Sequence, residues 1–372
     1  MTRTIAVEQD GHAAAGTGNT MMRQWLESGK RLAAAVVAAV FLLAGAAAWA
    51  GAAPEETYMP EIPLGLEEDN FFVPKDNPLT KEKIELGRFL FFDKRLSRNS
   101  SIACATCHIP ALAFTDGQPV SMGIDRRRGG RSAPTAINRA FSKAQFWDGR
   151  APSLEAQSIG PLINPVEHGF PDHDAAVARL NTIEGYKKLF KEVFGTGITI
   201  ENVGKAIASF QRTLISGNSP FDRYDRELEE TISEAAKRGR KLFFGKARCN
   251  LCHFGSNFSD EKFHNLGIGW DGDMVDLGRY AVTRDPKDIG AFKTPTLREI
   301  SRTAPYMNDG RFGTLEEVVE FYNQGGIKNP FQDNQIIPLK LTESEKRDLV
   351  EMLRTLNGEG WQNVKAPTSF PK

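Results

Sequence analysis

Apolar residues recur at helical spacing along most of this chain. Thr342 and Glu345 have the capping-box spacing that starts a helix, and Gly358 is of the residue type that ends one. Between them, one helix face is marked by apolar residues at the i, i+3, i+4 and i+7 positions, namely Leu349, Met352, Leu353 and Leu356. The period-2 alternation of strands is scarce, and loops rich in glycine, such as 117–130, separate the helical segments. The pattern predicts an all-α protein with long loops.

The amino terminus departs from this pattern and predicts export. Basic residues precede an uncharged apolar stretch, residues 32–53, in which Ala48 and Ala50 form a small-x-small cleavage site. We predict a signal peptide over residues 1–50, with an uncleaved membrane anchor through 32–53 as the alternative. Both place the remaining chain in the periplasm. Residues 51–77 are rich in proline and acidic residues, and they predict an extended lead-in without a core.

Composition narrows the class of protein. The 372 residues include 47 basic and 47 acidic ones, and 40% are hydrophobic, which is typical of a globular protein and excludes a disordered or collagen-like chain. The length predicts about two domains. Because the net charge is zero, no overall positive field attracts nucleic acid, and we expect no nucleic-acid partner.

Two copies of one five-residue motif, C-x-x-C-H, carry the chemistry: Cys104-Ala105-Thr106-Cys107-His108 and Cys249-Asn250-Leu251-Cys252-His253. Two thiols at this spacing can attach the two vinyl groups of one heme, and the adjacent histidine is placed to coordinate its iron. A zinc site or a redox dithiol would use the thiols but would not explain a histidine after both pairs. The motifs therefore predict two covalently bound c-type hemes. Two other histidines, His173 and His264, are predicted to be surface residues.

The chain also repeats itself at an offset of 161 residues. The repeated pieces are Pro134-Thr135 with Pro295-Thr296 and Asp148-Gly149-Arg150 with Asp309-Gly310-Arg311. By the same offset Tyr322 corresponds to Pro161, and tyrosine can bind iron whereas proline cannot. This predicts a six-coordinate heme in the second half and an open heme in the first. The alternative for Tyr322 is a core aromatic at the end of a helix over residues 315–321.

Three further runs, QFWDGR, GPL and NPVE, lie between residues 145 and 167. Together with two heme motifs in this order, they make the chain resemble the bacterial diheme cytochrome c peroxidase and MauG family, from about residue 77 to about residue 358. The resemblance implies two cytochrome c-like helical domains in tandem. A peroxidatic heme domain would cover residues 78–225 and an electron-transfer heme domain residues 226–372.

The resemblance also implies roles for individual residues. His108 and His253 are the proximal iron ligands. Glu167 is the distal acid/base, which moves a proton between the two peroxide oxygens, and Gln157 is its neighbour in the peroxide pocket. Trp147 lies between the two hemes, where it can carry charge from one iron to the other.

Two positions favour the MauG-like subtype of this family. Peroxidases that need reductive activation have a distal histidine where this chain has Ile124. Their electron-transfer heme takes a methionine ligand, whereas this chain has Tyr322 at that position and MauG also has a tyrosine there. MauG, however, oxidises its partner protein through a surface tryptophan, and Ala247 stands at that position here. The substrate route of MauG is therefore not implied for this chain.

The predicted function is that of a periplasmic cytochrome c peroxidase, which reduces hydrogen peroxide at the first heme with electrons passed through the second. The donor would be a small redox protein, either a c-type cytochrome or a cupredoxin. One alternative is MauG-like oxidation of residues in a partner protein, and another is a non-catalytic diheme electron-transfer cytochrome. The resemblance also implies one Ca²⁺, bound by the carbonyls of Thr303 and Pro305, with Ser132 at the position of an asparagine ligand. The sequence does not identify the electron donor, the heme potentials or the oligomeric state, for which a homodimer is one option.

Overall fold

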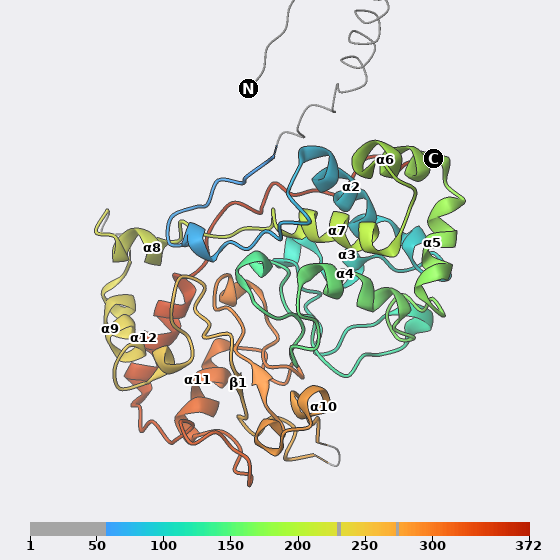
Figure 1. Ribbon diagram of the computed structural model, residues 1–372. Helices are drawn as coiled ribbons and strands as arrows, with labels where there is room; N and C mark the ends of the chain where they lie inside the picture. Colours follow the sequence, from blue (N-terminus) through green and yellow to red (C-terminus); the bar gives the residue numbers. More distant parts are fainter. Residues whose placement is uncertain (1–56, 229–231, 273–274) are drawn as a thin grey trace, which may run out of the picture. The chain divides into compact units, whose positions relative to one another are not determined.

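Helices dominate the computed structural model, which describes residues 57–228, 232–272 and 275–372 (Figure 1). They are α2 (Lys81–Phe92), α3 (Cys104–Cys107), α4 (Leu154–Ile163), α5 (His173–Asn181), α6 (Glu184–Phe194), α7 (Ile200–Gln211), α8 (Pro220–Asp225), α9 (Glu234–Phe243), α10 (Tyr280–Thr283), α11 (Leu315–Gln324) and α12 (Glu343–Arg354). Within those three ranges, no helix combines the length and apolarity that crossing a bilayer requires. The predicted export segment over residues 1–50 lies outside them.

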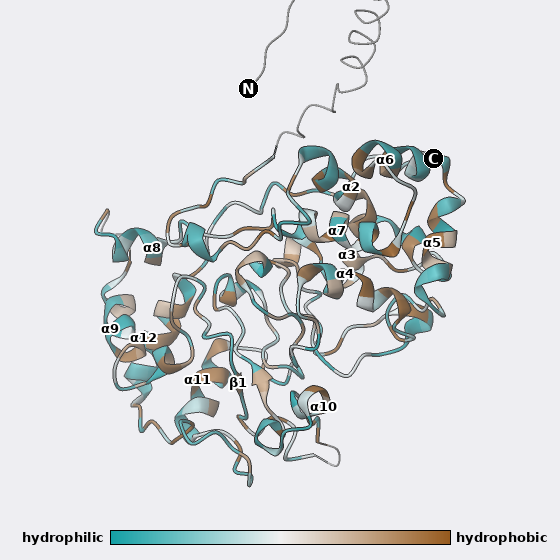
Figure 2. Ribbon diagram, in the orientation of Figure 1, coloured by the Kyte–Doolittle hydropathy of each residue, from teal (hydrophilic) through white to brown (hydrophobic). Residues whose placement is uncertain are grey.

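The all-α prediction is wrong in one detail, because the structure contains a small antiparallel sheet. Its two strands are β1 (Phe263–His264) and β2 (Phe292–Lys293), with Phe263 opposite Lys293. A strand of two residues is too short to show a period-2 pattern, so the sequence carries no signal for it. Helices such as α9 carry both hydrophilic and hydrophobic residues, as amphipathic helices do (Figure 2).

Two helix pairs form the frame of the molecule: α2 packs against α7, and α9 packs against α12 (Figure 1). A glycine lies at each crossing. A Cβ atom added to Gly87 would lie 1.9 Å from the carbonyl oxygen of Ala206, and one added to Gly239 would lie 2.0 Å from that of Asp348. Each helix pair therefore approaches more closely than any residue with a side chain would permit.

Replacing either glycine by alanine is expected to lower the free energy of unfolding by about 1–3 kcal/mol, because the helices must separate to admit the methyl group. Gly197→Ala is the matched control, since a Cβ atom there has no neighbour within 4 Å. Chemical denaturation of Gly87→Ala and Gly239→Ala measures the loss. Stabilities equal to that of the control would show that the helices do not cross at these glycines.

The repeat seen in the sequence is also present in the backbone. Ser153 caps α4 and Thr314 caps α11, so the two caps are 161 residues apart, and each hydroxyl accepts a hydrogen bond from the helix it caps. Pro161 is the eighth residue of α4, and Tyr322 is the eighth residue of α11. Because α11 continues to Gln324, Tyr322 lies inside the helix and not beyond the end expected at residue 321.

The last helix begins as predicted and ends earlier. Thr342 caps α12, and the capping box with Glu345 is confirmed. The helix ends at Arg354, and Gly358 instead donates its backbone N–H to Glu299 Oε1 at 2.7 Å. Gly358 thus connects the chain after α12 to Glu299 and is not the residue that ends the helix.

Residues 57–372 form one compact unit that contains separate hydrophobic cores. One core is built almost entirely from residues 86–214 and another from residues 221–356. Trp361 joins the first core, where it packs against Phe114 with the ring centroids 6.2 Å apart. A division into domains at residue 225 stays a prediction.

The lead-in is not free of core residues, so that part of the prediction is wrong. Leu66 and Phe71 are buried in a third small cluster, and the Phe71 ring packs edge-on against Phe141 at 5.4 Å. The apolar residues of the lead-in are too few and too irregularly spaced to predict burial. They are buried because the segment crosses the surface left open beside Phe141 and Ile215.

Candidate functional site

Each C-x-x-C-H motif lines its own cavity. The first cavity encloses about 500 Å³ and is lined by Cys104, Cys107 and His108. The second encloses about 220 Å³ and is lined by the second motif, Cys249, Cys252 and His253. All four cysteines are free thiols and divide between the two cavities, so they do not meet around one ion. This excludes the four-thiolate zinc site and leaves two separate places for a prosthetic group.

The two motif histidines are held in the same way. Nδ1 of His108 donates to the carbonyl of Phe114, and Nδ1 of His253 donates to the carbonyl of Phe258, both at 2.9 Å. Burial lowers the pKa of both imidazoles. A neutral ring whose Nδ1–H is engaged presents its Nε2 lone pair, which is the form that binds iron. Each cavity thus offers two thiols and one oriented imidazole, as a covalently attached heme requires.

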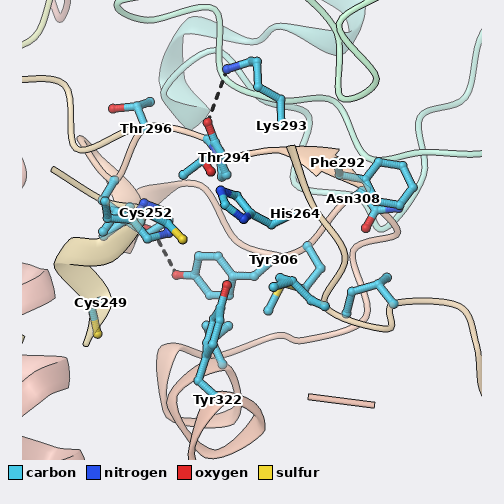
Figure 3. A pocket seen from close by; sticks show the side chains of 18 of the residues that line it. Cys249, Cys252, His264, Phe292, Lys293, Thr294, Thr296, Tyr306, Asn308 and Tyr322 are labelled. Carbon is cyan, nitrogen blue, oxygen red and sulfur yellow. Dashed lines mark hydrogen bonds between the residues drawn. The ribbon is translucent and has the colours of Figure 1, made fainter. Parts of the chain in front are cut away.

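Tyr322 lines the second cavity with its phenol ring (Figure 3). Within the described residues its hydroxyl makes no hydrogen bond, whereas the hydroxyl of Tyr306 in the same cavity donates to the carbonyl of Ile300 at 2.9 Å. Burial is the largest cause that raises the pKa of the Tyr322 phenol, and the nearby thiols of Cys252 and Cys249 raise it further. A phenol oxygen that has no hydrogen-bond partner and lines the cavity of the heme motif fits a ligand to iron.

The first cavity has no such atom at the equivalent position, where Pro161 lines the wall. Gly123 lines the cavity, and the next residue, Ile124, is 1% exposed. Its backbone N–H donates at 3.0 Å to the carbonyls of Val166 and Glu167. The segment that carries Ile124 is therefore fixed next to Glu167, and its side chain cannot coordinate a metal.

Glu167 places a carboxyl group in the first cavity. Its Oε1 accepts a hydrogen bond of 2.6 Å from Asn164 Nδ2. Burial raises the pKa of this carboxyl, while the charge of Arg150 and the Asn164 hydrogen bond lower it. A carboxyl group whose pKa lies above its usual value accepts a proton more readily than an exposed glutamate does and can then return it, as a proton shuttle requires.

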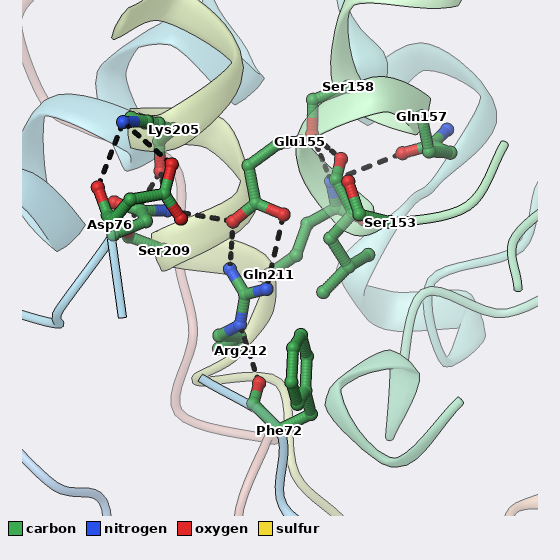
Figure 4. Close-up of polar contacts among 12 residues, drawn as sticks. Phe72, Asp76, Ser153, Glu155, Gln157, Ser158, Lys205, Ser209, Gln211 and Arg212 are labelled. Atoms are coloured by element: carbon green, nitrogen blue, oxygen red, sulfur yellow. Dashed lines mark hydrogen bonds and ion pairs between the residues drawn. The ribbon is translucent and has the colours of Figure 1, made fainter. Parts of the chain in front are cut away.

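Gln157 lines the same cavity from α4 and is held from α7. Gln211 Nε2 donates to Gln157 Oε1 at 3.3 Å and to Ser158 Oγ at 2.9 Å (Figure 4). The next residue of the chain, Arg212, is 1% exposed and pairs with Glu155 of α4 at 2.7 Å. This ion pair locks α7 against α4 and so fixes the residues that hold Gln157, a support that the sequence does not reveal.

Trp147 lines both cavities and belongs to the wall between them. Its indole N–H donates to the carbonyl of Ser132 at 2.9 Å, and its own carbonyl accepts the backbone N–H of Lys293 at 2.8 Å. The predicted position between two prosthetic groups therefore agrees with the shared wall. The three residues expected near Ca²⁺, Ser132, Thr303 and Pro305, all line the second cavity.

The prediction that His264 and His173 are surface residues is wrong. His264 lies in β1, and its ring nitrogens contact Asp260 at 2.9 Å and Asp333 at 2.5 Å. Although burial lowers its pKa, hydrogen bonds to Asp260, Cys252 and Asp333 outweigh this effect and raise it. Among the described residues, Cys252, Asp260 and His264 form the one group with metal-ligand spacing, but both ring nitrogens of His264 are already hydrogen-bonded to carboxylates. His173 is half-buried against the carbonyl of Ile159.

Comparisons with known proteins agree with this arrangement. Residues 81–230 match the model of a family described as di-haem cytochrome c peroxidase. The methylamine utilization protein MauG of Methylorubrum extorquens is 44% identical over 77% of this chain and 81% of its own length. Cytochrome-c peroxidase IdrP1 of Denitromonas iodatirespirans is 38% identical over 88% of this chain and 92% of its own. The crystal structure of a MauG-like protein associated with microbial copper homeostasis superimposes with a TM-score of 0.72 at 34% identity, covering 84% of this chain and 97% of that one.

Proposed function

Because this chain belongs to the di-haem cytochrome c peroxidase family that includes MauG, we propose that it reduces hydrogen peroxide in the first cavity with electrons that enter through the second. As a member of the family it is an oxidoreductase that uses peroxide and carries c-type heme. Cys104, Cys107 and His108 would hold one heme, and the second motif with Tyr322 the other. Heme iron, when bound, supplies the site at which peroxide coordinates and is reduced.

The observation that carries this proposal is the difference between two equivalent helix positions. Pro161 of α4 and Tyr322 of α11 line corresponding places in the two cavities, and only the tyrosine has an atom that binds iron. With a heme held in each cavity, a coordination position would therefore stay free for peroxide in the first, and Tyr322 would close that position in the second. A closed site suits electron transfer, and an open one suits reaction.

The residues around the open position perform the proton chemistry. Glu167 takes a proton from one peroxide oxygen and returns it to the other, which makes the leaving oxygen a better leaving group. Asn164 holds the Glu167 carboxyl, and Gln211 holds Gln157 beside it. Trp147, which lines both cavities, provides an aromatic path for charge between them. A non-catalytic cytochrome would have no use for a half-buried carboxyl group at this place.

The similarity to MauG and the Tyr322 ligand favour a second candidate, oxidation of residues in a partner protein. Ala247, where MauG has its surface tryptophan, is 4% exposed and offers no aromatic route to the surface. A small redox protein as electron donor therefore has the stronger support.

Three finer proposals accompany this function. The two heme domains would cover residues 78–225 and 226–372, one Ca²⁺ would lie near Ser132, Thr303 and Pro305, and the protein would be periplasmic.

Peroxide turnover by the diferric protein is expected to begin without a lag, because Ile124, at the position of the distal histidine of peroxidases that need reductive activation, cannot bind the first iron. In a stopped-flow experiment, hydrogen peroxide should change the heme spectrum at once, and added ferrous c-type cytochrome should then be oxidised. A lag that disappears after prior reduction would mean that a side chain closes the first site. Spectral change without any oxidation of cytochrome or cupredoxin would favour the partner-protein alternative.

A further inference from the structure

Arg139 is a buried cation that no carboxylate of the described residues contacts. Its side chain is in the 3₁₀ helix Arg139–Phe141, and the residue is 9% exposed. Nε donates to Gln145 Oε1 at 2.9 Å and one terminal nitrogen donates to the carbonyl of Ala144 at 3.4 Å. A guanidinium has five N–H donors, so the remaining ones are unused within the described residues. Arg139 lines both cavities.

Lys293 is the second buried cation of the same wall. It is 4% exposed, lines both cavities and lies opposite Tyr322 in the view of the second cavity (Figure 3). Its Nζ contacts Glu261 Oε1 and the carbonyl of Thr294, both at 3.3 Å. Glu261 already accepts a shorter bond of 2.9 Å from Ser142 Oγ and one of 3.2 Å from the backbone N–H of Lys143. Glu261 is thus the carboxylate partner of Lys293 and makes no contact with Arg139.

A buried charge is costly unless an opposite charge and hydrogen bonds compensate for it. The nearby Asp260 is hydrogen-bonded to His264, so it acts on Lys293 through its charge and contacts neither cation. Burial lowers the pKa of Arg139, and burial together with the charge of Arg139 lowers the pKa of Lys293 to about 8. Among the described residues, the guanidinium of Arg139 therefore has no carboxylate partner in the wall between the cavities.

The repeat indicates that neither half of the chain needs these cations to form its own fold. At the offset of 161 residues, Arg139 corresponds to Ile300 and Lys293 corresponds to Ser132. A cation is thus unnecessary for the local backbone at either position. The loop arginines Arg126–Arg128 are exposed; Arg128 alone of the three lines the first cavity, and none of them lines both.

We propose that Arg139 and Lys293 form a carboxylate-binding pair that holds heme propionates from both cavities at the shared wall. This inference rests on the proposed two-heme function, because the hemes bring the carboxylates. Guanidinium and ammonium groups facing carboxylates from both sides fix the edges of both hemes next to Trp147. They also raise the reduction potential of each iron, since a nearby cation disfavours the ferric state.

The test is a spectroelectrochemical titration of the purified two-heme protein. In Arg139→Gln the potentials of both hemes are expected to fall, with at least a tenfold rise in the ratio of ferric to ferrous iron at a fixed potential, about 59 mV for a one-electron couple. The propionate bands in resonance Raman spectra should shift as well. Arg139→Lys should restore most of both shifts, because it keeps the charge. Lys143→Gln is the matched control, since Lys143 is exposed beside the same wall.

Lys293→Ser provides an independent variant that introduces the residue found at the equivalent position of the repeat, and it should also lower both potentials. Unchanged potentials in a variant that retains two hemes would overturn the proposed pair, and so would a shift confined to one heme. A wild-type protein with fewer than two covalently bound hemes would instead overturn the proposed function. The heme count of the wild-type protein therefore separates the two failures.

Discussion

Glu167→Gln is expected to slow the reaction of the diferric protein with hydrogen peroxide by about 100-fold, at the lower end of the 10²–10⁴-fold effect typical of a positioned acid/base. Glutamine occupies the same volume and can still accept the hydrogen bond from Asn164, but it cannot move a proton between the peroxide oxygens. The observed rate constant at low peroxide concentration measures the loss. Both heme spectra should stay as in the wild type, because Glu167 is not an iron ligand in this account.

The pH dependence of the same rate gives a second signature. Burial raises the pKa of Glu167. As the pH falls, this carboxylate is therefore protonated at a higher pH than that of an exposed glutamate. The wild-type rate should therefore decrease as the pH drops through this raised pKa, and the rate of Glu167→Gln should lack that step. The control is Glu82→Gln at an exposed position of α2, which should keep the wild-type rate and profile. An unchanged rate in Glu167→Gln would remove the assigned role.

Tyr322→Phe is expected to abolish the low-spin spectrum of the second heme while the first heme keeps its own. The substitution removes one oxygen atom and leaves the ring, and this hydroxyl has no hydrogen-bond partner within the described residues, so the fold should tolerate it. Loss of an oxygen ligand that stabilises ferric iron should also raise the potential of the second heme. Optical and electron paramagnetic resonance spectra of the ferric protein measure the change.

The second cavity offers a matched control for this substitution. Tyr306→Phe removes a hydroxyl from the same cavity, but that hydroxyl already donates to the carbonyl of Ile300. Its removal should cost stability and leave both heme spectra unchanged. The ligand assignment would be contradicted if Tyr322→Phe kept the low-spin spectrum or if Tyr306→Phe lost it.

The sequence predicts what depends on local motifs. Each C-x-x-C-H segment does line a cavity of its own, and the offset of 161 residues recurs in helix caps, in tight turns and in the positions of Pro161 and Tyr322. These features follow from residues adjacent in the chain or at one fixed spacing. The start of α12 at its capping box is predictable for the same reason.

What the sequence misses depends on contacts between distant segments. His264 carries no motif, and its two aspartate partners lie on separate loops. Arg139 and Lys293 look like ordinary surface cations until the fold buries them in one wall. The apolar residues of the lead-in likewise show no periodicity, because the surface that buries them is assembled from other parts of the chain. The spacing of apolar residues predicts which face of a helix or strand is buried, but it does not predict which other segment packs against that face.

The central claim is that one coordination position is open in the first cavity and closed in the second. Electron paramagnetic resonance of the purified diferric protein at low temperature measures this directly, because five-coordinate and six-coordinate ferric hemes give high-spin and low-spin signals. The account predicts one high-spin and one low-spin signal of equal intensity. Two low-spin signals, or the signal of a single heme, would contradict it.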